Sequence, residues 1–103
     1  MPALRSFGMT EMKGASRDED AIYFGRMVKR LRLQHGWTVE QLANTVGMTR
    51  VHVSVIERGG NSPKLRTFIA LSNALGADPT EVLRAILQNR AQLRQATRAP
   101  RSR

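Results

Sequence analysis

The chain contains no cysteine, and this absence excludes several kinds of protein. A disulfide-stapled scaffold, a catalytic thiol and a zinc site built on cysteine are all ruled out. Aromatic residues are scarce as well, with three Phe, one Tyr and one Trp among 103 residues. The core must therefore consist mainly of Leu, Val, Ile, Met and Ala, which suits packed helices better than a β-sandwich. The lack of thiols also fits a reducing, cytoplasmic setting.

Long apolar runs are missing too. No segment approaches the roughly 20 residues that a helix needs to cross a bilayer. No apolar stretch of about 7–15 residues follows Arg5 and Lys13, as a signal peptide would require. We therefore expect no membrane association and no secretion.

Acidic residues are outnumbered, with 17 Lys and Arg against eight Asp and Glu, for a net charge of +9. Such an excess in a small domain implies an anionic partner, which is a nucleic acid, an anionic membrane surface or an acidic protein. The excess is concentrated in residues 21–37 and in residues 89–103, neither of which contains an acid.

Periodicity divides the chain into three parts. Residues 1–16 show no repeating apolar pattern, and we expect a flexible arm there. Residues 17–88 carry helical apolar spacing and form the predicted domain. Residues 89–103 are expected to extend the last helix and then end in a basic, disordered tail.

Capping residues and glycines predict five helices and no strand. The first spans 17–35, from the capping-box spacing of Ser16 and Glu19 to the stop at Gly36. Two short helices follow, one between Thr38 and Gly47 and one over 50–58. A fourth begins with Ser62 as its cap and Pro63 as its first residue, and runs to Gly76. A fifth begins with Asp78 and Pro79 and runs to about Thr97.

The spacing around Gly47 is the most informative feature of the sequence. A short helix ends at this glycine, Met48 follows, and Thr49 caps the next helix. Two helices joined by so few residues must cross steeply, which requires a positive φ in the turn and a small residue, here Ala43, at the crossing. Apolar side chains are expected to bury the underside, namely Leu42, Val46, Val53 and Ile56.

These motifs resemble the lambda-repressor and Cro-like (XRE-type) helix-turn-helix family. The resemblance covers residues 24–83 and includes FGRMVKRLRLQHGWTVEQLA, VGMTRVHVSVIERG and NSPKLRTFIALSNALGADPTEVL. It implies an all-α, compact five-helix DNA-binding domain, with helices 2 and 3 as the helix-turn-helix and helix 3 in the major groove.

The resemblance also implies roles for individual residues. The positions that face base edges are Thr49, Arg50, Val51 and Val55. Those near phosphates are Thr38, Arg58, Asn61 and Lys64. Arg32 and Glu57 match an ion pair between helices 1 and 3 that is common in the family.

The chemistry of these side chains agrees with such roles. The forked guanidinium of Arg50 suits the O6 and N7 acceptors of guanine, and the methyl groups of Val51 and Val55 suit the methyl of thymine. Two positions depart from the family pattern. Val39 replaces a common Gln that contacts phosphate, and Val55 stands where many members carry a polar or basic residue.

We therefore predict a sequence-specific transcriptional regulator of bacterial or phage type that binds double-stranded DNA in the cytoplasm as part of the nucleoid. The alternative is an antitoxin or a restriction–modification controller whose partner includes a protein, such as a toxin. The sequence shows no nucleophile–base set, no paired-carboxylate site and no metal-ligand spacing around its two His residues, so no enzyme, metal site or cofactor is expected. Homodimerisation is expected through a heptad-like seam of the last helix, formed by Val82, Ile86, Asn89 and Leu93, although this stripe has the alternative of folding back on helix 1.

Overall fold

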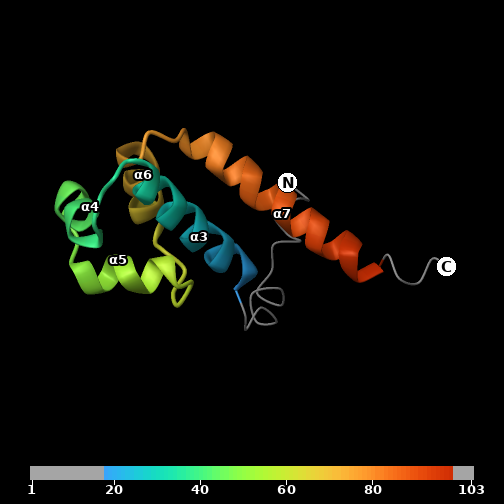
Figure 1. Cartoon of the computed structure of the whole chain (residues 1–103). Coiled ribbons are helices and arrows are strands. Elements are labelled where there is room, and N and C mark those ends of the chain that lie inside the picture. Colours follow the sequence, from blue (N-terminus) through green and yellow to red (C-terminus); the bar gives the residue numbers. More distant parts are fainter. Residues whose placement is uncertain (1–17, 99–103) are drawn as a thin grey trace.

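The computed structural model describes residues 18–98, and this part of the chain forms five helices and no strand (Figure 1). The predicted all-α class is confirmed. The helices are α3 (Glu19–Gln34), α4 (Val39–Val46), α5 (Arg50–Glu57), α6 (Leu65–Ala74) and α7 (Pro79–Arg98).

Three of the predicted caps are present. The hydroxyl of Thr38 accepts from the N–H of Gln41, whose side chain accepts in return from the N–H of Thr38. Thr49 caps α5 by accepting from the N–H of His52 at 3.0 Å. Asp78 accepts from the N–H of Thr80 at 2.9 Å, directly before Pro79 opens α7. Each cap satisfies a backbone donor that the first turn leaves without an intrahelical partner.

Two helix starts differ from expectation. The N-cap of α3 is Asp18, whose carboxylate accepts from the N–H of Ala21, and the predicted cap Ser16 lies outside the described residues. The fourth helix begins at Leu65, so its predicted start at Pro63 is wrong. The backbone of Lys64 is extended, with φ −68° and ψ 157°, and this prevents the helical turn from reaching back to the proline.

The core lies where α3 packs against the other helices. Figure 1 shows α3 between α5 on one side and α7 on the other, with α4 and α6 beyond its C-terminal end. The rings of Phe24 and Phe68 meet at 5.0 Å between centroids, which joins α3 to α6. The ring of His35, at the C-terminal end of α3, lies 2.9 Å from the carbonyl oxygen of Leu75 and stacks on Trp37 at 4.6 Å. The fully buried side chains are Val28, Leu42, Val53, Ile56 and Leu71.

The predicted dimer seam on the last helix is wrong for its first two members. Val82 and Ile86 belong to the core of the single chain, where α7 packs along α3. They are 4% and 7% exposed and are therefore not available to a partner. The alternative, in which this stripe folds back on the first helix, is correct for these two residues. Packing against α3 buries their side chains without a second chain.

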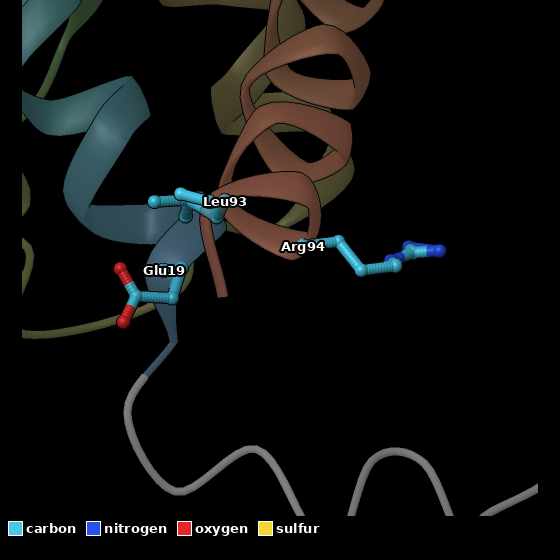
Figure 2. Close-up of a pocket in the computed structure, with 4 residues that line it drawn as sticks. Glu19, Leu93 and Arg94 are labelled. Atoms are coloured by element: carbon cyan, nitrogen blue, oxygen red, sulfur yellow. The ribbon is translucent and has the colours of Figure 1, made fainter. Parts of the chain in front are cut away.

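The far end of α7 runs beside the beginning of α3. Glu19, Leu93, Arg94 and Ala96 line an open pocket there, in which Leu93 faces α3 and Arg94 points away into solvent (Figure 2). Arg90, one turn earlier, forms an ion pair with Asp20 of α3. None of the described helices combines the length and the apolar character that a membrane span needs.

Candidate nucleic-acid interface

The corner between α4 and α5 is tight. Gly47 has φ +71°, and the N–H of Met48 donates to the carbonyl of Ala43 at 2.8 Å, which closes the end of α4. Ala43 itself is buried and forms part of the core. The left-handed backbone at Gly47 costs glycine little, whereas a residue with a Cβ would be strained there. The predicted geometry of the turn is therefore present.

The start of α5 is directed outward. Val53 and Ile56 are buried, which turns Arg50 and Val51 toward solvent. Val51 is 69% exposed, which is high for a valine in a helix that packs against two others. Thr49 is also exposed, although its hydroxyl oxygen already accepts the capping bond. Three of the four predicted base-contacting residues thus lie on one accessible turn.

Val55 is placed differently from the other three. Its side chain is half-buried, and its Cγ1 lies 3.1 Å from the point that a Cβ on Gly60 would occupy. The carbonyl of Val55 also accepts from the N–H of Gly60 at 3.0 Å. Val55 therefore packs against the loop after α5 and exposes only part of its own side chain. The sequence pattern did not indicate this packing role.

The four residues predicted near phosphates are all exposed, and they lie at helix ends or in the loop between α5 and α6. Lys64 is the N-cap of α6, where no side chain among the described residues caps the first turn. The N–H groups of that turn therefore remain directed outward beside a cation, as in a helix N-terminus that receives an anion. The residues in question are Thr38, Arg58, Asn61 and Lys64.

The charge of this region is predominantly positive. Between Thr38 and Ala77 the sequence contains two acids, Glu40 and Glu57, against four cations, Arg50, Arg58, Lys64 and Arg66. The carboxylate of Glu57 is engaged by Arg32 and therefore does not offset the exposed cations.

Arg32 and Glu57 form a two-pronged ion pair between α3 and the end of α5. Nε of Arg32 donates to Oε2 at 2.6 Å and Nη2 donates to Oε1 at 3.1 Å. The third donor, Nη1, binds the carbonyl of Trp37 at 2.8 Å. Both side chains are largely buried, and the hydrogen bonds that Arg32 donates to Glu57 raise the pKa of Arg32 above its usual value in spite of the burial. The pair fixes the angle between α3 and α5.

Gly25, in the middle of α3, is a positioning residue that the sequence analysis did not identify. A Cβ on it would lie 2.2 Å from the carbonyl oxygen of Ile56 and 2.9 Å from that of Glu57. Gly59 makes a similar approach to the backbone of Ile22, at 2.8 Å. The sequence carried one signal for this role, which is a glycine inside an otherwise regular helix. Glycine lowers the stability of a helix, so its presence there indicates a position where close packing leaves no room for a side chain.

Comparison with known proteins agrees with this geometry. A family model described as Helix-turn-helix matches residues 28–82, just over half of the chain. The chain therefore belongs to the helix-turn-helix family. It is 33% identical over 61 residues to a protein of Bacillus subtilis (strain 168) named as the SPbeta prophage-derived uncharacterized HTH-type transcriptional regulator YonR. That match covers 59% of this chain and only 56% of the relative.

Two solved structures resemble the fold. The restriction-modification controller protein C.AhdI from Aeromonas hydrophila is 33% identical, with a TM-score of 0.58 over 62% of this chain and 97% of that one. The clp gene regulator ClgR from Corynebacterium glutamicum gives a TM-score of 0.61 over 68% of this chain and 91% of that one. At 23% identity, the second likeness concerns the fold alone.

Proposed function

We propose that the protein is a sequence-specific, DNA-binding transcriptional regulator that reads the major groove with α5 and has no enzymatic activity. The observation that carries the proposal is the outward turn at Thr49, Arg50 and Val51, on a helix held rigidly by α3. A recognition surface needs such rigidity, because a side chain must reach base edges in a fixed register. Membership of the helix-turn-helix family supports the same function.

Each exposed residue of the turn has a chemical partner in the groove. The Arg50 guanidinium donates two parallel bonds to O6 and N7 of guanine, and the methyl groups of Val51 contact the C5-methyl of thymine. Thr49 contributes a hydroxyl, and the exposed part of Val55 extends the apolar strip. Around this turn, the cations and the uncapped start of α6 receive phosphates and set the register on the duplex.

We propose further that two copies bind together. One domain of this size covers a short stretch of DNA, and a two-fold pair places two recognition helices on half-sites about 34 Å apart. A regulator of this kind acts in the cytoplasm, on nucleoid DNA. The seam of Val82 and Ile86 is not the interface, since both residues are buried within one chain.

The test is the replacement Arg50→Ala. Preferred duplexes are first selected from a random pool with the unaltered protein, and both proteins are then titrated with a selected and a scrambled duplex at fixed salt. We expect the substitution to abolish discrimination between the two duplexes. The contact with guanine is worth about 1–3 kcal/mol, which corresponds to roughly 5- to 150-fold in affinity for the selected duplex.

Arg84→Ala is the matched control, because Arg84 is an exposed arginine on α7. It should leave discrimination unchanged. If Arg50→Ala discriminates between the duplexes as well as the unaltered chain does, the assignment of α5 as the reading helix is wrong. If the pool yields no preferred duplex, sequence-specific recognition itself is wrong.

A second candidate is an antitoxin or a restriction–modification controller that also binds a protein, such as a toxin. The strongly exposed Val51 and the likeness to C.AhdI favour it. Co-expression of the tagged chain with the product of the adjacent gene distinguishes the two candidates. A stable complex of defined stoichiometry supports the second, and independent migration of the two proteins contradicts it.

A further inference from the structure

The outer face of α3 carries cations and a leucine. The buried residues of this helix include Phe24, Val28 and Arg32, and the side chains on the opposite face lie in solvent. Those exposed side chains recur at intervals of three and four residues, which places them on one ridge of the helix. The members of this α3 ridge are Arg26, Lys29, Arg30 and Leu33, and all four are exposed.

The cations of the α3 ridge have no acidic partner in the described part of the chain. The two ion pairs found there belong to Arg32 and to Arg90, and residues 21–37 contain no acid. Arg26 and Arg30 stand four residues apart, a spacing at which like charges destabilise a helix. The ridge therefore holds positive charge that does not stabilise the fold of the single chain.

Leu33 adds an apolar spot to this ridge, since its side chain is 57% exposed. It follows Lys29 by four residues and Arg30 by three, so both basic side chains are its neighbours on the helix surface. Long basic side chains often cover adjacent apolar surface with their methylene groups. Here more than half of the leucine stays in water, and the ridge presents an apolar group beside three cations.

The α3 ridge is separate from the turn that the proposed function assigns to DNA. Figure 1 shows α3 between α5 and α7. Val53 and Ile56 of α5 are buried where that helix packs against its neighbours, and Val51, on the other side of α5, is exposed. A duplex seated on the exposed side of α5 therefore leaves the α3 ridge open to a second ligand.

We propose that the α3 ridge binds a segment of another protein that carries carboxylates beside an apolar side chain. The carboxylates pair with the cations, and the apolar side chain packs on Leu33 as both leave water. This surface is distinct from Val51, to which the second candidate function assigns a protein partner. A regulator of this kind holds DNA on α5 and its protein partner on α3 at the same time.

The exposed leucine decides between the kinds of anion that would fit. Phosphates of a duplex would pair with the cations but would gain nothing from Leu33, whose burial needs an apolar neighbour. A second copy of this chain offers no matching surface, because the exposed acids of the described residues are spread over three helices. These acids are Glu19 on α3, Glu40 on α4, and Asp78 and Glu81 at the start of α7.

The first experiment uses a labelled helical peptide that copies the ridge with reversed charge. One Leu is followed by Glu three, four and seven residues later, which matches the ridge in an antiparallel pair of helices. Binding to the full chain is measured by fluorescence anisotropy at fixed low salt. Arg26→Gln combined with Arg30→Gln should weaken binding about 10-fold, because two ion pairs with the peptide are lost. Arg84→Gln combined with Arg94→Gln is the matched control on α7, and it should weaken binding less than about 3-fold.

The second experiment tests the leucine by a cycle of substitutions in both partners. Leu33→Ser should weaken binding of the peptide about 5-fold, because an apolar contact is lost. The same substitution should change nothing for a peptide in which Ser replaces the Leu. Circular dichroism and thermal unfolding should show that all variants are folded, since the substituted side chains are exposed.

Four outcomes overturn the proposal. Equal losses in the ridge variant and in the α7 control indicate general attraction to a basic protein, and equal effects of Leu33→Ser on both peptides exclude the apolar contact. Displacement of the peptide by a selected duplex, in place of a complex of all three components, assigns the ridge to DNA. A change in the mass of the free protein caused by the ridge substitutions assigns it to a second copy. Failure of the DNA proposal gives a different result, because Arg50→Ala should leave peptide binding unchanged.

Discussion

The carbonyl oxygen of Ile56 lies 2.2 Å from the point that a Cβ on Gly25 would occupy, so α5 rests directly on the backbone of α3. The contact lies at the C-terminal end of α5, next to the ion pair of Arg32 and Glu57. Backbone contact and ion pair together fix the orientation of α5. A substitution at Gly25, Arg32 or Glu57 is therefore expected to shift the position of the exposed turn at Arg50, because α5 moves as a rigid helix.

Gly25→Ala should lower the free energy of unfolding by about 3 kcal/mol or more, because a methyl cannot fit against a backbone carbonyl without moving α5. Urea denaturation measures the change. Gly36→Ala is the control, since Gly36 has φ +74° but open space around its Cβ position, and it should cost only about 1 kcal/mol. Because alanine favours helices, equal or greater stability of Gly25→Ala would show that the close approach is absent.

Arg32→Lys should destabilise the fold by about 3 kcal/mol, although the charge is kept. A lysine cannot reproduce the three directed hydrogen bonds to Glu57 and Trp37, and it leaves part of a buried carboxylate without a partner. Asp20→Asn, at the exposed pair with Arg90, should change stability by less than about 1 kcal/mol. Similar losses for the two variants in thermal or urea unfolding would contradict the difference in burial.

The elevated pKa of Arg32 has a defined consequence for pH dependence. A folded-state pKa above the unfolded value means that the stabilisation is complete below the unfolded pKa and is lost only as the pH rises through the folded pKa. Since the pKa of arginine in the unfolded chain already lies far above the neutral range, the contribution of Arg32 to stability should be constant from pH 5 to about pH 10. The difference in unfolding free energy between the unaltered chain and Arg32→Met, measured across that range, should therefore be flat. A decline between pH 6 and pH 9 would assign the dependence to another group.

Val51→Ala and Val55→Ala should separate recognition from stability. Val51 is exposed, so its truncation should change the free energy of unfolding by no more than about 0.5 kcal/mol while weakening binding to thymine-containing sites. Val55 packs near Gly60, so its truncation should cost about 1 kcal/mol of stability. The pair is measured by denaturation and by titration with a selected duplex. Equal stability losses would show that the two valines are equally buried.

Lys64→Ala should weaken binding to all duplexes by a similar factor and should reduce the slope of log affinity against log salt by about 0.9. Arg84→Ala is again the matched control, because Arg84 is an exposed cation on α7. It should leave both affinity and slope nearly unchanged. A change of sequence preference in Lys64→Ala would place Lys64 at base edges instead of phosphates.

Local features of this fold could be predicted from the sequence because they depend on neighbours along the chain. Thr38, Thr49 and Asp78 cap the helices that follow them, and Gly47 makes the corner, since capping bonds and a positive φ are decided within a few residues. The start of α6 was not predictable in this way. The pair Ser62 and Pro63 satisfies the local rule for a helix start, but the chain stays extended through Lys64.

The sequence by itself determined five helices, the corner at Gly47 and an outward turn at Arg50, because apolar spacing and capping chemistry are written in consecutive residues. Only the tertiary structure decided which apolar stripe of α7 is buried, why Gly25 has no side chain, and that Val55 serves the loop at Gly60. The physical reason is that burial and close approach depend on residues distant in the chain. Val82 with Ile86 and Leu83 with Leu87 have the same apolar spacing in the sequence, and only the packing of α3 decides that the first pair is buried.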